Sequence, residues 1–547
     1  MTRPTSSALR HGLTERNHTT HHHGLHAPKS RRWLAALAIG LAATIAAVAI
    51  AVTARDDART GRSSPLGAVP RLKPAVTFAT RPNIVFVLTD DLSTDLVKYM
   101  PAVLAMQQNG LTFDDYFVSD SLCCPSRSSI FTGNFPHDTG VFGNAGPHGG
   151  FKVFHDRGEE QDTFALALQR AGYRTAMMGK YLNGYLTDQA GVPATYVPPG
   201  WSDWQVAGDG YAELDYTLND NGTLEQYGDQ PSDYLTDVLA RKGVDFINSA
   251  ATDGKPFFLE LATFAPHHPF VPAPRDADLF PGLQAPRGPN FDVLPLNPPS
   301  WLAGHPPLTD QQLNRINHVF RRRVQDVQSV NDMIVSIETA LAADGLAGDT
   351  YLVFSSDNGL HMGQYRLMPG KLTAFDTDIH VPLIVVGPGV PAGAHTDAMA
   401  ENIDLAKTFT QIGGTDLPSD GHSLMPLLQG QTPADWRNAI LVEHHGPDLY
   451  TSDPDYQAYP AGSPTTYEAM RTHDFLYVEY RDGEREYYDL QTDPFELDNI
   501  AGELSPTYLA GLHDELAAME NCHTGPACWA AMHVHQLADA RRRRRRR

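Results

Sequence analysis

The chain has 547 residues, of which 41% are hydrophobic and 19% charged, and its formal net charge is −22. This composition excludes a disordered polyelectrolyte, a collagen and a transporter with many membrane spans. Basic residues gather at the two ends, in residues 1–54 and Arg541–Arg547, which leaves 29 basic and 63 acidic residues between them. A body this acidic is not expected to bind nucleic acid through its general surface, so an anionic ligand needs a local basic pocket.

The N-terminal region predicts export. Trp33–Ala54 is a stretch of 22 residues without a charge, and it directly follows a short basic segment. This pattern is typical of a secretory signal peptide, and its length also suits an uncleaved membrane anchor. We therefore expect residues 1–54 to be a signal peptide or signal anchor and residues 55–80 a linker. The protein is expected to be secreted or held at the outer face of the cytoplasmic membrane.

Apolar, β-branched runs alternate with amphipathic helical patterns between residues 81 and 437. This alternation predicts an α/β catalytic domain with a mostly parallel central sheet flanked by helices on both faces. The predicted strands are 83–88, 173–178, 257–264, 351–355 and 381–386. The predicted helices are 163–172, 234–249 and 310–343, the last being one helix or two.

The pattern changes in the last third of the chain. Residues 266–307 are crowded with proline, which predicts a long ordered loop of a kind that often carries function. Residues 438–503 hold short strands and a hairpin turn, which predict a smaller antiparallel subdomain. Residues 504–540 are predicted as a C-terminal helical segment, and the arginines of 541–547 as a solvated tail that can also contact anionic polymers or lipids.

The chain has four cysteines. Cys522 and Cys528 close a short loop that fits a disulfide in an oxidising compartment. A metal site that includes His523 is the alternative, but it lacks a fourth ligand. Cys123 and Cys124 are adjacent, and adjacent cysteines rarely bridge each other because the geometry is strained. These two cysteines therefore need another explanation.

Acidic and amide side chains follow two predicted strands. Asp90 and Asp91 come directly after the strand 83–88, and Asp357 and Asn358 come directly after 351–355. Ligands of parallel α/β sheets bind beyond the carboxyl ends of the strands. Three carboxylates and one amide oxygen at that edge form a hard donor set, which favours Ca²⁺ or Mg²⁺ over zinc. Each pair taken alone is equally consistent with a turn or a helix cap.

The segment Leu122–Gly133 reads LCCPSRSSIFTG. Pro125 followed by small polar residues suits a helix N-terminus, whose free N–H groups attract anions, and Arg127 adds a further donor. From physics alone, the segment is either a nucleophile at an anion site or a buried structural cysteine pair.

The order Cys-x-Pro-Ser-Arg, with glycine six residues after the arginine, resembles the signature of the type I sulfatases. The resemblance implies that a dedicated formylglycine-generating enzyme oxidises Cys123 to formylglycine and that Cys124 is a variable position. It implies an alkaline-phosphatase-like fold and a calcium ion bound by Asp90, Asp91, Asp357, Asn358 and the modified Cys123. Phe131 stands where the family usually has leucine.

Three further residues match positions of the same family. The resemblance implies that Lys180, in GKYLN, and Lys371, in PGKLT, contact the sulfate group, and that His267, in APHHP, belongs to the Pro-His-x-Pro motif. A family histidine two residues after the first lysine is replaced here by Leu182, with Asn183 as a substitute. GKYLN and APHHP are similar to the N-acetylglucosamine-6-sulfatase branch, but a lysine or histidine of this kind, taken alone, is more often a surface or structural residue.

The implied activity is hydrolysis of a sulfate monoester of a sugar or an aryl alcohol. Formylglycine hydrate would be the nucleophile, and Arg127, Lys180 and Lys371 would neutralise the sulfuryl oxygens. Either His267 or one of the lysines would protonate the leaving group. One alternative is a phosphodiester or phosphonate monoester hydrolase of the same superfamily. The other is an inactive envelope protein that binds sulfated glycans through an unmodified Cys123.

Overall fold

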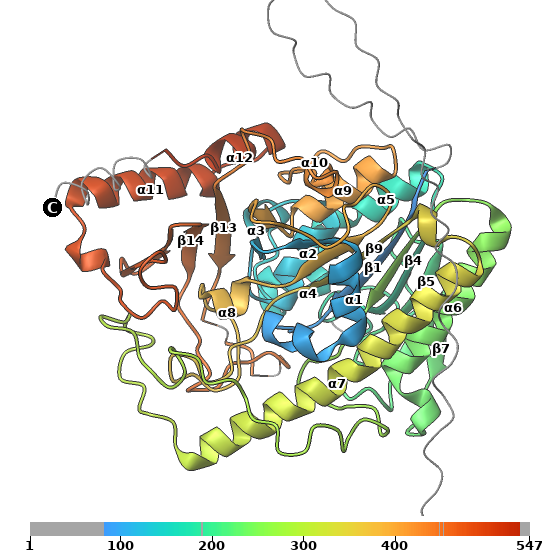
Figure 1. The fold of residues 1–547 in the computed structure, drawn as a ribbon, viewed down its shortest axis with the longest axis horizontal. Coiled ribbons are helices and arrows are strands. Elements are labelled where there is room, and N and C mark those ends of the chain that lie inside the picture. The colour runs from blue at the N-terminus through green and yellow to red at the C-terminus, as the bar shows by residue number, and fades with distance from the viewer. Residues whose placement is uncertain (1–80, 188–189, 448, 452, 536–547) are drawn as a thin grey trace, which may run out of the picture. The chain divides into compact units, whose positions relative to one another are not determined.

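The computed structural model describes residues 81–535 apart from 188–189, 448 and 452 (Figure 1). Within this range a ten-stranded sheet forms the centre of the molecule. Across the sheet, the strands are β11 (Ala394–Thr396), β2 (Leu111–Phe113), β10 (Leu383–Val386), β9 (Thr350–Ser356), β1 (Asn83–Thr89), β8 (Phe257–Ala262), β4 (Arg174–Lys180), β5 (Asp203–Ala207), β6 (Thr217–Asp220) and β7 (Thr223–Gln226).

The middle of the sheet confirms the predicted parallel arrangement. Strands β9, β1, β8, β4 and β5 run parallel to one another. Side chains of β1 alternate between two apolar cores, with Phe86 in one and Val85 and Val87 in the other, and all are fully buried. A strand buried on both faces must be apolar throughout, which explains the unbroken run that marked it in the sequence. Strand β10 joins β9 in the antiparallel direction.

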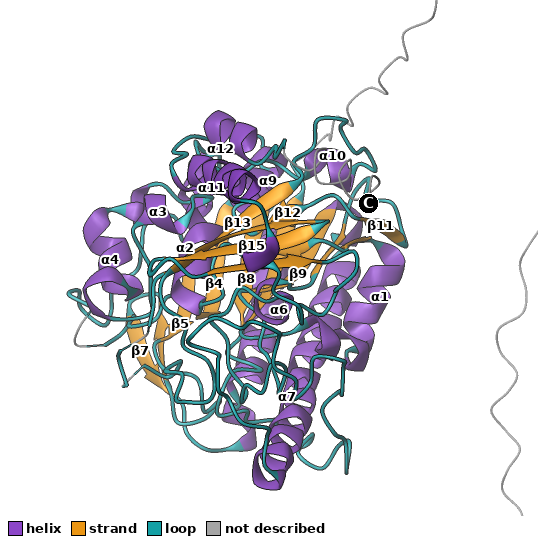
Figure 2. Cartoon of the chain, turned by 90° about the vertical axis from the view of Figure 1, so that its left-hand side faces the viewer, coloured by secondary structure: helices purple, strands orange, loops and turns teal. Residues whose placement is uncertain are grey.

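Helices cover both faces of the sheet (Figure 2). One face carries α1 (Pro101–Asn109), α6 (Leu235–Asp253) and α7 (Asp310–Ala343), and the other carries α2 (Cys123–Thr132), α4 (Gly150–Arg157), α5 (Phe164–Arg170) and α9 (Asp404–Ile412). The segment predicted as one helix or two is the single helix α7. It begins at a capping box in which Thr309 and Gln312 satisfy each other's backbone N–H groups.

The sequence analysis did not predict several short elements. Strands β2, β5, β6, β7 and β11 lie toward the edges of the sheet, and β3 (Tyr116–Phe117) pairs with β12 (Ala400–Glu401). Strands of two to five residues give no readable period, because one face of such a strand holds only one to three side chains. Single-turn helices are α3 (Pro136–Thr139), α8 (Asp376–Ile379) and α10 (Met425–Leu428). Short 3₁₀ helices are Thr94–Tyr99, Gly146–His148, Glu159–Gln161, Pro231–Asp233, Ala347–Asp349 and Ala501–Glu503.

A second, four-stranded sheet follows in the C-terminal part, as predicted. Its antiparallel strands are β13 (Ala439–His444), β14 (Tyr467–Thr472), β15 (Phe475–Tyr480) and β16 (Arg485–Asp489). Helices α11 (Pro506–Glu520) and α12 (Gly525–Ala531) come after it, and the predicted disulfide joins Cys522 to Cys528. The proline-rich stretch between β8 and α7 contains no helix or strand, as expected.

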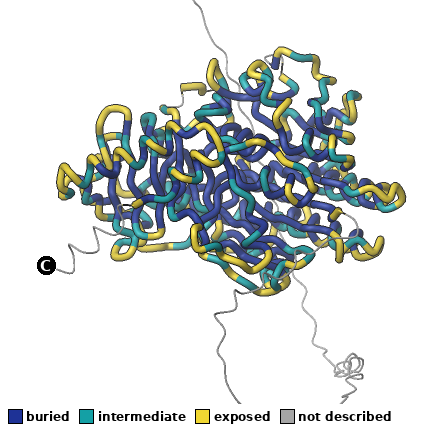
Figure 3. Tube along the Cα trace, turned by 90° about the horizontal axis from the view of Figure 1, so that it is seen from above, coloured by how far each residue is buried: buried dark blue, intermediate teal, exposed yellow. Residues whose placement is uncertain are grey.

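Buried backbone follows the two sheets and their covering helices, and exposed backbone concentrates in the connecting loops (Figure 3). Within the described ranges we find no helix with the length and apolar character that a bilayer span requires. The predicted signal segment, the linker and the arginine tail lie outside the described residues. The domain boundaries stay predictions.

Arg471 of β14 connects the second sheet to the catalytic region. Its guanidinium binds both carboxylate oxygens of Asp376 in α8, at 2.8 and 2.9 Å. We expect Arg471→Ala to lower the free energy of unfolding by about 2–3 kcal/mol, because it leaves a largely buried carboxylate without its counter-ion. Denaturant unfolding measures this change. Arg481→Ala, at an exposed hairpin position, is the control and should shift it by about 0.5 kcal/mol or less. Equal effects of the two variants would contradict the role given to Arg471.

Candidate active site

The predicted residues lie together at the carboxyl ends of four neighbouring strands. In the sheet order β9, β1, β8, β4, adjacent strands end at the same edge, so residues far apart in sequence meet there. All of these side chains are buried. They are Asp357 and Asn358 after β9, Asp90 and Asp91 after β1, His267 after β8, and Lys180 at the end of β4. Asp91 has a φ of 63°, a left-handed conformation that aspartate tolerates better than most residues.

Cys123 is the first residue of α2, so the helix begins two residues earlier than the position of Pro125 suggested. Its Sγ atom lies 3.0 Å from Nζ of Lys371 and 3.2 Å from Oδ1 of Asp90. The structure thus places Cys123 at a helix N-terminus, beside a buried cation and beside the acidic strand ends. This is the arrangement that the motif predicted for a nucleophile at an anion site.

Arg127 lies one helical turn after Cys123 and is fully buried. Its Nε atom pairs with Oδ2 of Asp357 at 2.8 Å, and Nη1 donates to the carbonyl oxygen of Lys180 at 3.0 Å. The remaining nitrogen, Nη2, is buried and has no hydrogen-bond partner among the described residues. A buried guanidinium nitrogen without an acceptor costs free energy, so this nitrogen marks a place for an acceptor from outside the chain.

The two lysines are both held in their charged form. Lys180 Nζ lies 2.5 Å from Asp90 Oδ2, and Lys371 Nζ lies 2.6 Å from Asp91 Oδ1. Burial alone would lower the pKa of each lysine, but the neighbouring carboxylates raise both values well above normal. The site therefore holds fixed positive charges at neutral pH, which is the local basic pocket that the acidic body of the protein requires for an anion.

The pKa values of two buried acidic groups, the Cys123 thiol and the Asp357 carboxyl, are shifted in opposite directions by their charged neighbours. Burial, together with the charges of Asp357, Asp455 and Asp90, raises the pKa of the Cys123 thiol well above its usual value. An unmodified Cys123 is therefore a protonated thiol and a poor nucleophile at neutral pH. Burial would also raise the pKa of Asp357, but Arg127 and the two lysines lower it to about 2, so this carboxylate is charged.

The oxygen-rich strand ends fit a hard divalent cation. Asp90, Asp91, Cys123 and His267 each offer a donor atom within 4.8 Å of the others. Asp357 Oδ1 accepts the backbone N–H of Asp91 at 3.1 Å, which brings the β9 end against this cluster. The Oδ1 atom of Asn358 is buried, and no residue in the described part of the chain donates a hydrogen bond to it. A buried amide oxygen that lacks a donor is well suited to a metal ion, so the residues present fit the implied cation.

Asp455 is a site residue that the sequence analysis missed. Its Oδ1 lies 2.6 Å from His267 Nε2 and 2.7 Å from Lys371 Nζ, and its Oδ2 lies 3.6 Å from Cys123 Sγ. Asn144 donates to the same carboxylate at 2.6 Å. Asp455 belongs to the long connection between β13 and β14, and an aspartate in such a loop has no motif or period that could have identified it.

His267 is engaged at both ring nitrogens. Nδ1 lies 2.7 Å from the carbonyl oxygen of His268, and Nε2 lies 2.6 Å from Asp455. Both partners are acceptors, so both nitrogens carry a proton. Burial alone would lower the pKa of His267, but Asp455, Asp91 and Asp90 raise it to about 9.

Asn183 does not directly contact these charged groups. Its amide donates to the hydroxyl of Tyr211 at 3.3 Å, and its Oδ1 atom is buried without a hydrogen-bond partner within the described ranges. The Tyr211 ring lies between Asn183 and the site, with its centroid 4.6 Å from that of His267 and 5.0 Å from Nζ of Lys180. Asn183, the substitute for the family histidine in the GKYLN motif, is therefore connected to the charged groups through Tyr211.

Comparisons with known proteins identify the family of this chain. The family model described as Sulfatase matches residues 82–415, and the model described as N-sulphoglucosamine sulphohydrolase, C-terminal, matches residues 363–521. The chain is 35% identical to human N-acetylglucosamine-6-sulfatase, over 82% of this chain and 86% of that protein. It is 30% identical to the arylsulfatase of Volvox carteri, over 83% and 77%. It is 33% identical to the extracellular sulfatase SULF-1 homolog of Drosophila melanogaster, over 67% of this chain and 33% of that one.

Solved structures share the fold. One is an enzyme in complex with its substrate D-glucosamine-2-N,6-O-disulfate, with a TM-score of 0.66, 24% identity, and 81% and 97% of the two chains covered. Another is a phosphonate monoester hydrolase from Silicibacter pomeroyi, with a TM-score of 0.61, 23% identity, and 79% and 93% covered. Because the family model spans most of the chain and the relatives match over most of its length, the chain belongs to the sulfatase family and is a sulfuric ester hydrolase.

Proposed function

We propose that the protein hydrolyses 6-sulfated glucosamine residues of a glycan, with aryl sulfates as simpler substrates, using a formylglycine made from Cys123. The observation that carries this proposal is the position of Cys123 at the start of α2, 3.0 Å from the buried Lys371 and 3.2 Å from Asp90. The pKa of its thiol is raised, so the unmodified side chain is a poor nucleophile, and oxidation to an aldehyde accounts for a cysteine in this position.

The fixed charges define where the sulfuryl group binds. Lys180, Lys371 and the free Nη2 of Arg127 supply donors that neutralise the sulfuryl oxygens as negative charge develops. Donors held in place before the reaction need no reorganisation, and each such donor typically contributes a few kcal/mol to the rate. His267 and Lys371 already donate to Asp455, so the substrate has to take over these contacts from the Asp455 carboxylate.

Two groups that the family implies complete the chemistry. Formylglycine would supply a hydrated aldehyde as the nucleophile, and loss of a proton from its second hydroxyl would let sulfate leave and restore the aldehyde. A bound Ca²⁺, with Mg²⁺ as the alternative, would supply positive charge that stabilises the negative charge developing in the reaction. Asp90, Asp91, Asp357 and Asn358 would hold the cation, and His267 donates its Nε2 proton to the leaving oxygen.

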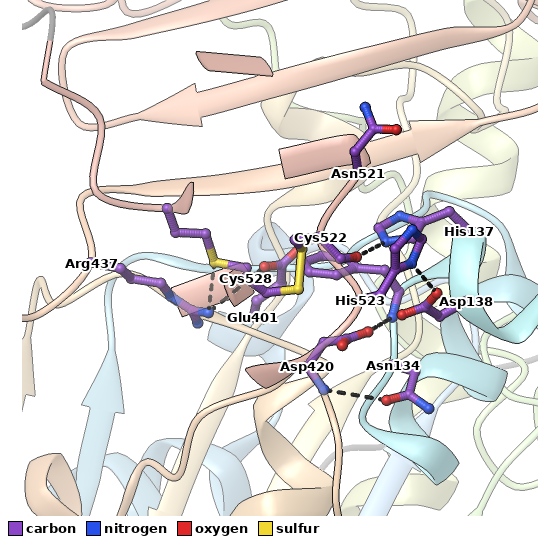
Figure 4. Close-up of a disulfide and its surroundings, with 12 residues drawn as sticks. Asn134, His137, Asp138, Glu401, Asp420, Arg437, Asn521, Cys522, His523 and Cys528 are labelled. Atoms are coloured by element: carbon purple, nitrogen blue, oxygen red, sulfur yellow. Dashed lines mark hydrogen bonds and ion pairs between the residues drawn. A yellow bond between two sulfur atoms is a disulfide. The ribbon is translucent and has the colours of Figure 1, made fainter. Parts of the chain in front are cut away.

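The relatives support a substrate class and a location for the protein. Human N-acetylglucosamine-6-sulfatase and the structure solved with D-glucosamine-2-N,6-O-disulfate both support a 6-sulfated glucosamine substrate. The Drosophila relative is named an extracellular sulfatase, which supports export. The apolar segment 33–54 and the Cys522–Cys528 disulfide (Figure 4) support the same location.

Activity toward phosphorus esters is the second candidate. The phosphonate monoester hydrolases of similar fold favour it, and the cations of the site can bind a phosphoryl group as well as a sulfuryl group. Parallel assays with an aryl sulfate, an aryl phosphodiester and an aryl phosphonate monoester distinguish sulfatase activity from activity toward phosphorus esters. We expect the sulfate ester to have the highest kcat/KM, and a preference for phosphorus would overturn the proposal.

The state of Cys123 decides between catalysis and binding alone. Mass spectrometry of the tryptic peptide that contains Cys123 should detect an aldehyde, and this residue should resist alkylation in active protein. A fully alkylated Cys123 in preparations that hydrolyse sulfate esters would refute the formylglycine mechanism. A fully alkylated Cys123 in inactive protein that still binds sulfated glycans would favour the alternative, an inactive protein that only binds these glycans.

Removal of the divalent cation is expected to abolish turnover. Dialysis against a chelator should lower kcat at least about 100-fold, because a metal ion typically supplies several kcal/mol of transition-state stabilisation. Added Ca²⁺ should restore activity, and elemental analysis should report its binding. In Asp91→Asn, calcium affinity and activity should fall together, whereas the exposed control Asp482→Asn should change neither. Full activity of the stripped protein would contradict the proposal.

His267 is expected to matter most for substrates with poor leaving groups. Its pKa of about 9 keeps the imidazolium charged below that pH, so kcat should fall as pH rises through about 9. His267→Gln should lower kcat about 100-fold for a sugar sulfate but far less for 4-nitrophenyl sulfate, whose leaving oxygen needs no acid. A pH profile for each substrate measures this difference. Equal losses for both substrates would rule out His267 as the acid.

A further inference from the structure

The side chains of the candidate active site are closed off from solvent. The exposed fraction is 0% for Cys123, Arg127 and Lys371, 2% for His267 and 3% for Lys180. A sulfate ester has to touch these groups in order to react, because catalysis requires the reacting atoms to be in contact. The structure therefore shows a closed state of the site, and some part of the chain has to move before a substrate can bind.

The carboxylate of Asp455 lies where the reacting group of a substrate would have to lie. It contacts Lys371 Nζ at 2.7 Å, His267 Nε2 at 2.6 Å and Cys123 Sγ at 3.6 Å. Lysine and imidazolium groups bind carboxylates and other oxyanions through the same kind of charge-assisted hydrogen bond. Burial alone would raise the pKa of Asp455, but Lys371 and His267 lower it well below its usual value. Asp455 is therefore an anion, and it fills the site as a bound anion would.

The backbone that carries Asp455 lies at the surface of the protein. Within residues 453–459, Tyr459 is 73% exposed, whereas Asp455 is 3% exposed. The segment forms a local turn, in which the N–H of Asp455 donates to Asp453 Oδ1 at 2.9 Å and the side chain of Gln457 donates to the carbonyl oxygen of Asp455 at 2.6 Å. These hydrogen bonds persist if the segment moves as a unit, so Asp455 can be withdrawn without unfolding the turn.

Asn144 keeps an acceptor when Asp455 is withdrawn. Its amide nitrogen donates to Asp455 Oδ2 at 2.6 Å and lies 3.5 Å from Asp453 Oδ1. Its Oδ1 atom accepts the backbone N–H of Cys124 at 2.9 Å, which holds Asn144 beside α2. Asp453 can accept the amide hydrogen that Asp455 releases, so the movement leaves this buried donor paired.

We propose that Asp455 is an internal competing anion, which closes the site of the free protein and which a sulfate ester has to displace in order to bind. The inference rests on the proposed function, because the two anions compete for Lys371 and His267. A tethered carboxylate has an effective concentration of roughly millimolar or more, so weak anions in solution do not displace it. A sulfuryl group can displace it, because its proposed contacts include Arg127 Nη2, a nitrogen that no described residue accepts from.

Competitive inhibition by inorganic sulfate measures this displacement. Wild type is compared with Asp455→Asn and with the matched control Asp453→Asn, which removes the same charge from the same segment, all at saturating Ca²⁺. A site that Asp455 fills in about nine of ten molecules binds sulfate about tenfold more weakly than an open site. The inhibition constant should therefore fall at least about tenfold in Asp455→Asn and less than about threefold in Asp453→Asn.

Three results of this experiment would overturn the proposal. They are an unchanged or higher inhibition constant in Asp455→Asn, an equal fall in Asp453→Asn, and a loss of calcium affinity in Asp455→Asn, which would make Asp455 a ligand of the cation. Thermal unfolding checks that the variants fold, and Asp455→Ala replaces Asp455→Asn if the latter does not.

Hydrogen exchange of residues 453–459 reports the movement directly. Saturating sulfate should accelerate exchange of these amides in wild type, because Asp455 no longer anchors the segment. In Asp455→Asn exchange should be fast with and without sulfate. Unchanged or slower exchange of the wild-type segment in sulfate would contradict displacement.

Lys371→Ala separates a failure of this inference from a failure of the proposed function. If sulfate inhibits Lys371→Ala as strongly as wild type, the proposed sulfuryl contacts are wrong and the competition has no basis. If sulfate inhibition is lost in Lys371→Ala but does not strengthen in Asp455→Asn, the sulfuryl contacts stand and only the role of Asp455 is refuted.

Discussion

Cys123→Ala should reduce turnover of sulfate esters at least about 10⁴-fold, to the level of the uncatalysed background. Alanine cannot be converted to an aldehyde, so the variant lacks the nucleophile, and loss of a nucleophile is among the largest single effects known for an enzyme. The charges contributed by Lys371, Lys180 and Arg127 remain, so binding of inorganic sulfate should be retained. Steady-state kinetics with an aryl sulfate and a competition assay with sulfate measure the two effects separately.

Cys124→Ala is the matched control for this experiment. Cys124 is buried in the apolar core, and its backbone N–H donates to Asn144 at 2.9 Å, a bond that alanine keeps. Removing the sulfur atom leaves a small cavity, and we expect a loss of stability of about 1 kcal/mol with most of the turnover retained. The same loss of turnover in both variants would contradict the assignment of Cys123 as the nucleophile.

Lys371→Ala should lower kcat/KM for sulfate esters about 10²–10³-fold. The Nζ atom of Lys371 lies 3.0 Å from Cys123 Sγ, 2.6 Å from Asp91 and 2.7 Å from Asp455. Loss of this charge removes a donor to the sulfuryl oxygens and leaves two buried carboxylates without a counter-ion. The inhibition constant of inorganic sulfate should rise with the loss of activity, because sulfate uses the same donor in the absence of turnover.

Two controls separate the loss of this contact from a loss of folding. Lys407→Ala removes a lysine outside the site, and its activity should stay within about twofold of wild type. Lys371→Arg keeps the charge but moves it, so sulfate binding should recover in part while turnover remains low. If sulfate inhibits Lys371→Ala as strongly as wild type in correctly folded protein, Lys371 does not contact the sulfuryl group.

The buried strands were predicted correctly, and the motif residues could be singled out, because each carries a local signal. An unbroken apolar run such as that of β1 follows from burial on both faces of a sheet, and it is readable without knowledge of the neighbours. Parallel strands end at a common edge, so the polar residues after β1 and β9 were expected to meet, and the structure brings them together. The order of Cys123, Pro125 and Arg127 along one helix is likewise a local feature.

Asp455 and the contacts beside the disulfide could not be predicted in this way. Asp455 comes from the connection between two strands of the C-terminal sheet, more than 300 residues after Cys123. The loop reaches the site because that sheet is fastened to the core through contacts such as Arg471 to Asp376. In the same way, the sequence contains His523 and Asp138, but only the folded chain shows that they meet.

The amino-acid sequence alone determined the family, the α/β core and the motif residues that we propose as the site, because all of these depend on residues within one strand, one helix or one strand end. The tertiary structure decided which of these side chains pair with which, and that the Asp455 carboxylate contacts both His267 and Lys371. These contacts depend on the packing of loops and helices from distant parts of the chain, and packing of this kind leaves no pattern in any short stretch of sequence.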